Sequence, residues 1–134
     1  MQNKLELNIV SPMSLVVSEE VAMVVAPGID GYFGILANHM PFLTVLRPGV
    51  IEIFNDKDTR PARTFFVEGG VAEVNNQGCA LLVDSAIDCG DITSQIVADW
   101  QANLDRNSKN MSSSERERQL EVIGAMERVI SDIA

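Results

Sequence analysis

The stretch that decides the fold class reads FLTVLRPGVIEIF and covers residues 42–54. It holds two apolar runs, Phe42–Leu46 and Val50–Phe54, and each has the length of a β-strand rather than of a helix. Between the runs stands Arg47-Pro48-Gly49, and a Pro-Gly pair is a strong turn signal. The stretch therefore predicts two neighbouring strands joined by a short turn.

Strand-length apolar runs continue on both sides of this stretch. Turn residues separate them about every 8–12 positions, a spacing that is typical of a β-sandwich or barrel. We expect Pro27-Gly28 to end one run and begin a loop, and Asn55–Asp58 to form a hairpin tip. The further runs are Leu5–Val10, Leu15–Val17, Val21–Ala26, Thr64–Glu68, Val71–Val74 and Cys79–Val83.

The pattern changes near residue 88, where the spacing of apolar residues lengthens to that of a helix. Asp91 is a suitable N-cap for a first helix, and residues 112–115 (SSSE) offer a capping box for a second. The helical apolar positions are Ile92, Ile96, Trp100 and Leu104, then Val122, Met126, Val129 and Ile133. The sequence thus predicts a mainly β chain with an α part: an N-terminal β-sandwich over residues 1–87 and a C-terminal antiparallel helix-turn-helix hairpin over residues 88–134.

Composition excludes several classes of protein. Ten Lys and Arg face nineteen Asp and Glu among 134 residues, and the net charge of −9 argues against binding to nucleic acids or to anionic lipid headgroups. No apolar run approaches the roughly 18 residues that span a bilayer, and the N-terminal residues carry no pattern of a secretory signal. We therefore expect any contact with a membrane to go through a protein partner.

The search for chemistry returns few candidates. Cys79 and Cys89 are interpreted as two reduced cysteines, one in a strand and one in a loop, with a disulfide or metal pair as the alternative. His39 is the only histidine, so it and two distant cysteines cannot complete a four-ligand zinc site. A capping or buried structural role explains His39 better than catalysis. The residues therefore offer no clear candidate for an active site, a metal site or a cofactor site.

The most unusual segment runs from Gly31 to Gly49, where glycines and prolines surround Tyr32 and Phe33. Glycine at this density marks tight turns or close approaches of the backbone. An aromatic pair at a loop tip either fills the local core or contacts another protein. The residues alone leave both interpretations open.

The chain resembles the epsilon subunit family of F-type ATP synthases, the equivalent of the mitochondrial delta subunit. The segment around His39 is the most specific part of the resemblance, because it follows the family pattern of glycines, histidine and proline closely. The resemblance covers the whole β part, whereas the hairpin matches by length and pattern. The matching segments are residues 7–12 (LNIVSP), 31–36 (GYFGIL), 38–44 (NHMPFLT), 46–49 (LRPG), 66–74 (FVEGGVAEV) and 84–87 (DSAI).

This resemblance implies a non-catalytic subunit of the central rotor stalk. Such a subunit binds the gamma subunit and the c-ring, couples proton translocation to ATP synthesis, and lies at the cytoplasmic face of the bacterial inner membrane as a peripheral part of the complex. The alternative is a chiefly regulatory subunit whose C-terminal hairpin inhibits ATP hydrolysis. A third interpretation, a small β-sandwich enzyme or ligand-binding module, needs a polar pocket near His39 that the sequence does not offer.

The resemblance also implies contact residues. Candidates for the gamma contact are Ser11, His39 and Pro41, and candidates for the c-ring contact are the loop residues Asp30, Gly31, Tyr32 and Phe33. Family members often carry a carboxylate at the position of Tyr32, so in this chain we expect Asp30 to supply that charge instead.

The hairpin carries the weakest candidates. Arg116 and Arg118 match the basic residues with which family members meet the beta subunit, and alpha or beta contacts are implied by them, although a solvated helix face with local ion pairs is the simpler interpretation. Some relatives bind ATP through an Asp and an Arg that are Thr93 and Ile96 here. Loss of the cation removes the main contact to phosphate, so we expect little or no ATP binding.

Overall fold

The computed structural model describes residues 4–37, 40–55 and 60–133. The chain divides into two compact units, Met1–Asp88 and Cys89–Ala134. In the part of the chain that the structure describes, the first unit holds ten strands and the second holds the helices, which confirms the predicted combination of a β-sandwich with a helical hairpin. Among the described residues, no helix is both long and apolar enough to cross a lipid bilayer.

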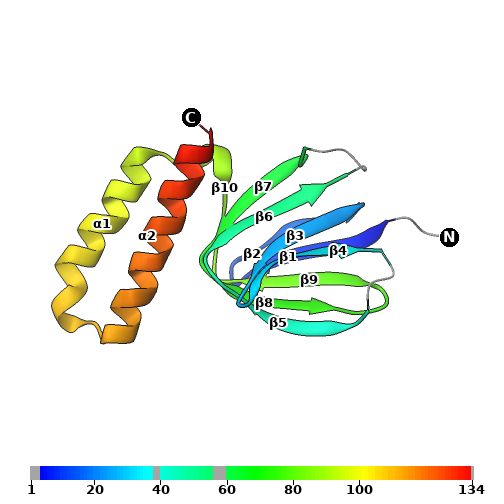
Figure 1. Ribbon diagram of the computed structural model, residues 1–134, viewed down its shortest axis with the longest axis horizontal. Helices are drawn as coiled ribbons and strands as arrows, with labels where there is room; N and C mark the ends of the chain where they lie inside the picture. The colour runs from blue at the N-terminus through cyan, green and yellow to red at the C-terminus, as the bar shows by residue number, and fades with distance from the viewer. Residues whose placement is uncertain (1–3, 38–39, 56–59, 134) are drawn as a thin grey trace. The chain divides into compact units, whose positions relative to one another are not determined.

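The strands pair in one path that folds into two layers (Figure 1). One layer has the order β4-β3-β6-β7-β10 and the other has the order β5-β8-β9-β1-β2. The two layers are joined where Gly28 of β3 pairs with Leu46 of β5. The strand bounds are β1 Leu5–Ser11, β2 Ser14–Val21, β3 Met23–Gly28, β4 Gly31–Leu36, β5 Phe42–Leu46, β6 Gly49–Phe54, β7 Arg63–Val67, β8 Gly70–Val74, β9 Gly78–Val83 and β10 Ala86–Asp88.

All the strand pairs are antiparallel among the described residues, except that β1 and β9 run parallel. The pair sets Leu7 opposite Cys79 and Ile9 opposite Leu81. No crossover helix is needed to make it, because β2 to β8 lie between these two strands in the sequence. Periodicity identifies strands but not this pairing.

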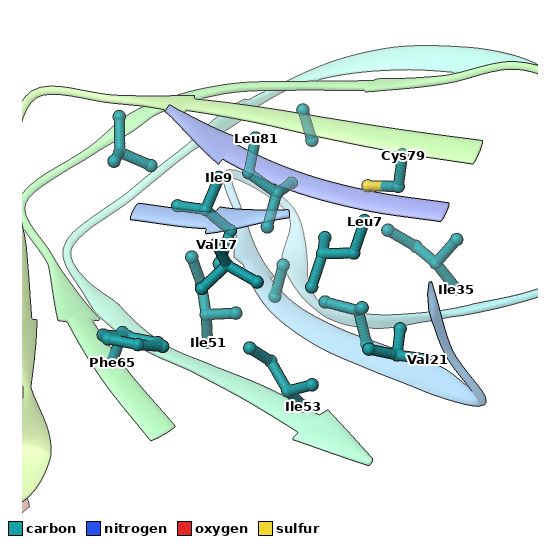
Figure 2. Close-up of a cluster of buried hydrophobic side chains, with 14 of the residues drawn as sticks. Leu7, Ile9, Val17, Val21, Ile35, Ile51, Ile53, Phe65, Cys79 and Leu81 are labelled. Atoms are coloured by element: carbon teal, nitrogen blue, oxygen red, sulfur yellow. The ribbon is translucent and has the colours of Figure 1, made fainter. Parts of the chain in front are cut away.

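The core lies between the two layers (Figure 2). Leu7, Ile9 and Leu81 from one layer and Ile51 and Ile53 from the other are fully buried and point toward one another. Alternate residues of each strand thus form the inner face, as the period of two predicts. Each fully buried side chain of this size contributes about 1.5–3 kcal/mol to stability.

Two expected boundaries are wrong in this unit. Pro27 and Gly28 do not begin a loop, because they are the last two residues of β3, and the segment expected as an exposed loop after them is strand β4. Pro27 fits at this place since β3 pairs with β6 only over Met23–Val25, so the N–H that proline lacks is not needed for that ladder. Its carbonyl accepts a hydrogen bond from the N–H of Arg47 at 2.9 Å.

The second unit consists of the helices α1 (Ser94–Asn107) and α2 (Ser113–Ile133), which lie side by side, with the 3-10 turns η1 (Cys89–Asp91) and η2 (Ser108–Asn110) before and between them (Figure 1). The first helix is capped by Thr93 and not by Asp91, since the Thr93 hydroxyl accepts the N–H of Ile96 at 3.3 Å. The Ser112 half of the predicted capping box is confirmed, because the Ser112 hydroxyl accepts the N–H of Glu115 at 3.1 Å. The Glu115 carboxylate accepts a hydrogen bond from the Gln119 side chain at 3.0 Å.

Candidate functional site

The β3–β4 turn carries the residues that the sequence suggested for a c-ring contact. Only Ile29 and Asp30 lie between the strands, and both are exposed. Gly31 begins β4 with a φ of +130°, a conformation that glycine adopts at little cost. The structure therefore brings Asp30 and Gly31 together at the tip of a tight hairpin.

The two aromatic residues after this turn lie on opposite faces of β4. Phe33 faces inward and packs against the core, with its ring edge-on to Phe42 at 5.4 Å between centroids. Tyr32 faces outward and is 59% exposed, while its hydroxyl accepts the backbone N–H of Val50 at 3.1 Å. Phe33 thus fills the local core, one of the two interpretations that the sequence left open, although it is only partly buried; Tyr32 is the more exposed of the two.

An apolar row crosses the outer face of the layer β5-β8-β9-β1-β2. The register places Val45 opposite Val71, Val71 opposite Leu82, Leu82 opposite Val10, and Val10 opposite Leu15. Three of the five are largely exposed: Val45 at 51%, Leu82 at 48% and Leu15 at 60%. We call these five residues the apolar row. A continuous apolar line on an exposed sheet face is typical of a protein–protein contact surface.

The sequence analysis missed the apolar row, because each member lies in a different strand. A signal was present in each strand, since an apolar residue stands at an outward position where alternation predicts a polar one. Val45, for example, lies between the inward-facing Thr44 and Leu46 of β5. Only the pairing of strands shows that such positions form one line.

Two of the three gamma-contact candidates lie at or next to the ends of strands that contribute to the apolar row. Ser11 follows Val10 directly, and its hydroxyl lies 3.3 Å from the carbonyl oxygen of Ser14 within the β1–β2 hairpin. Pro41 is exposed and immediately precedes β5. His39 lies outside the described residues. The structure thus places Ser11 next to Val10 at the end of β1, and Pro41 directly before β5, the strand that carries Val45.

The hairpin candidates are engaged within their own unit. The guanidinium of Arg116 donates to the carbonyl of Ser108 at 2.8 Å, which ties the start of α2 to η2. Arg118 lies 3.8 Å from the Glu115 carboxylate, one turn away on the same helix. Thr93 and Ile96 form the cap of α1 described above. Both arginines thus make contacts within the helical unit.

The described residues contain no group of three or more side chains that could hold a metal ion. Two hollows lie beside the β8–β9 turn, with volumes of about 40 and 130 Å³. Pockets for small ligands usually enclose roughly 300–1,000 Å³. These two hollows are therefore too small for such a ligand.

The family model and the curated relatives that match this chain name the same kind of ATP synthase subunit. Residues 4–88 match the family model described as ATP synthase, Delta/Epsilon chain, beta-sandwich domain. The ATP synthase epsilon chain of Paramagnetospirillum magneticum is 37% identical over 118 residues, which cover 88% of this chain and 86% of that protein. The epsilon chain of Rhodospirillum centenum is 48% identical over 88 residues, 66% of this chain and 60% of that relative's length.

One solved structure has the same fold over the full length. A chain in the Euglena gracilis mitochondrial ATP synthase, from a complex described as OSCP/F1/c-ring, superposes with a TM-score of 0.76 and covers 100% of this chain and 84% of its own. The sequences are 18% identical, so this likeness concerns the fold.

Proposed function

The chain belongs to the delta/epsilon chain family of ATP synthases, and on that premise we propose that it is a non-catalytic subunit of the central rotor stalk. In this role it binds the gamma subunit and the c-ring and couples proton translocation to ATP synthesis. It works at the cytoplasmic face of the bacterial inner membrane, as a peripheral part of a membrane-associated complex, and contacts the membrane only through its partners. It binds no nucleic acid and needs no cofactor of its own.

The apolar row is the observation that carries this proposal. Its side chains are neutral, although the chain as a whole has a net charge of −9. A row of apolar side chains on an acidic protein favours a partner that buries apolar area, which contributes about 25 cal/mol per Å². We assign this surface to the gamma subunit, with Ser11, Pro41 and His39 as further contacts.

The β3–β4 turn is assigned to the c-ring. Its tip presents the carboxylate of Asp30 beside Gly31, with Tyr32 and Phe33 directly behind it. An exposed carboxylate on a short, well-held turn orients a contact with basic groups while adding about 0–1 kcal/mol of binding free energy. The two surfaces thus give the subunit one partner along the stalk and one at the ring.

A native mass spectrum of the chain mixed with the gamma subunit of the same organism tests the first contact. We expect a one-to-one complex that Leu82→Glu abolishes or weakens more than tenfold, because the charge would be buried. The matched control is Leu36→Glu, since Leu36 is 55% exposed on β4, in the other layer. Equal loss with both variants, or no complex with the unmodified chain, contradicts the proposal.

A regulatory role is the second candidate. The chain divides into two compact units at Asp88, so the hairpin has the independence that a switching element needs. In this candidate the hairpin inhibits ATP hydrolysis, with Arg116 and Arg118 meeting the beta subunit. The same hairpin is expected not to bind ATP, since Thr93 and Ile96 replace the residues that would contact phosphate.

Removing residues 89–134 from the assembled enzyme distinguishes the two roles. A pure coupling subunit leaves the rate of ATP hydrolysis unchanged, whereas an inhibitory hairpin raises the rate when it is removed. Arg116→Ala and Arg118→Ala, measured with the full chain, then locate the inhibition. A raised rate only on removal of the hairpin would exclude these two arginines as the contact.

A further inference from the structure

The backbone of β3 changes partner next to the β3–β4 turn. Residues Met23–Val25 of β3 pair with β6. Farther along, at Gly28, β3 pairs with β5 instead. The carbonyl of Pro27 and the N–H of Ile29 hydrogen-bond to the backbone of Arg47 and Val45, at 2.9 and 3.0 Å. The turn is therefore attached to β5 on one side, at the corner where the two layers meet.

This change of partner leaves the N–H of Val50 in β6 without a strand partner on that side. The register that pairs Val25 with Glu52 would bring Pro27 opposite Val50, but the Pro27 carbonyl is already bound to Arg47. Tyr32, which is paired with Pro27 across β3 and β4, supplies the acceptor instead: its hydroxyl receives the Val50 N–H at 3.1 Å. One side chain of β4 thus reaches past β3 to β6.

Gly49 makes room for this contact. A Cβ at this buried position would lie 2.7 Å from the Tyr32 hydroxyl oxygen and 2.8 Å from the Pro27 Cβ. Both distances are shorter than real side-chain contacts, so any other residue would push the tyrosine ring or the proline away. The absence of a side chain at Gly49 and the hydroxyl of Tyr32 therefore belong to one arrangement.

A second contact holds the turn from the inner face. The ring of Phe33 lies against Gly28, where an added Cβ would come within 2.8 Å of two ring atoms, and it packs edge-on to Phe42. Consecutive aromatic residues thus fix the hairpin from both sides, Phe33 to β5 and Tyr32 to β6.

We infer that Tyr32 is a positioning residue, whose hydroxyl bond to Val50 sets the direction of the Ile29–Asp30 turn. The inference rests on the proposed function, because the direction of the turn matters only if Asp30 contacts the c-ring. It assigns to Tyr32 a role inside the chain, in addition to the direct contact suggested by its position in the sequence.

The free chain provides the first test, with Tyr32→Phe as the variant that removes only the hydroxyl. Loss of one hydrogen bond speeds hydrogen exchange of the Val50 amide about fivefold, and the NMR signals of Ile29 and Asp30 should shift. Gly49→Ala should do the same, and Gly34→Ala is the matched control, since its Cβ would meet only the Met23 sulfur at 3.8 Å. Unchanged Val50 exchange and turn signals in Tyr32→Phe overturn the inference.

Binding to a purified assembly of gamma and c-ring provides the second test. We expect Tyr32→Phe to weaken binding of the full chain about fivefold and Asp30→Asn to weaken it in a salt-dependent way. If Asp30→Asn weakens binding and Tyr32→Phe does not, the positioning role is wrong although the turn is the contact. If neither variant weakens binding, the proposed c-ring contact is itself wrong, whereas the altered Val50 exchange would still establish the intramolecular bond.

Discussion

The guanidinium of Arg63 lies 3.3 Å from the carboxylate of Glu19 and joins the two layers of the sandwich from outside the core. Arg63 belongs to β7 in one layer, and Glu19 belongs to β2 at the end of the other. The guanidinium also lies over the ring of Phe65, 5.1 Å from its centroid. The pair thus forms a polar bridge between strands that are 44 residues apart.

We expect this bridge to add little to stability, because both side chains are more than a third exposed: 43% for Arg63 and 36% for Glu19. A double-mutant cycle of Arg63→Gln and Glu19→Gln should give a coupling free energy of about 0–1 kcal/mol that decreases with salt. Chemical denaturation measures it, with Arg118 and Glu115 as a comparison pair within one helix. A coupling above about 2 kcal/mol would show that the bridge is shielded from solvent.

Gly78→Ala should be among the most damaging glycine substitutions. Gly78 opens β9 opposite Glu6, and an added Cβ would overlap the Glu6 carbonyl oxygen in the parallel β1–β9 pair. We expect a loss of about 2 kcal/mol or more in the free energy of unfolding, because backbone has to move. Gly34→Ala, with its Cβ 3.8 Å from the Met23 sulfur, is the control and should change stability by less than about 1 kcal/mol. Similar losses for both would contradict the close approach of β1 and β9.

Gly124→Ala should stabilise the protein. Gly124 lies inside α2, and a Cβ there would meet no atom within 4 Å. Alanine restricts the unfolded chain without a clash, so the free energy of unfolding should rise by about 0.5–1 kcal/mol. The reverse change at an exposed helical site, Ala102→Gly in α1, should lower it by a similar amount. Thermal and urea denaturation of both variants check the pair; a loss of stability in Gly124→Ala would mean that the space around this position is filled.

Cys79 should make stability fall at alkaline pH. Burial raises the pKa of its thiol from 9.0 to about 12. Below pH 9 the thiol keeps its proton in both states; above it, the unfolded chain loses the proton first, so the free energy of unfolding decreases as the pH rises toward 12. Urea denaturation of the unmodified chain and of Cys79→Ala across this range isolates the effect, because the other titrating groups are common to both. A constant difference between the two would contradict the raised pKa.

The same burial predicts slow alkylation of the Cys79 thiol in the folded protein. The thiolate is the reactive form, so iodoacetamide should modify Cys79 slowly in the folded protein at neutral pH and quickly in denaturant. Peptide mass spectrometry reads out the modification directly. Fast labelling of the folded protein would show that the β9 face of the core opens readily.

The sequence by itself determined the local elements and the family. The alternation from Leu5 to Ile9 predicts the inner face of β1 because a strand turns its side chains to alternate sides. Ser112 marks the start of α2 because a hydroxyl can replace the missing partner of a first-turn N–H. Such signals depend on neighbours within a few residues, so they can be identified without knowing where the rest of the chain lies.

Only the tertiary structure decided what lies on each surface. The apolar row includes Val10, Leu82 and Val45. The parallel pairing of β1 with β9 brings Val10 next to Leu82, and no periodicity in the sequence predicts this pairing. Tyr32 and Val50 are 18 residues apart, and their bond exists because β3 leaves β6 at Pro27. Contacts of this kind depend on strand order and register, which are set by the packing of the whole core and not by any short segment.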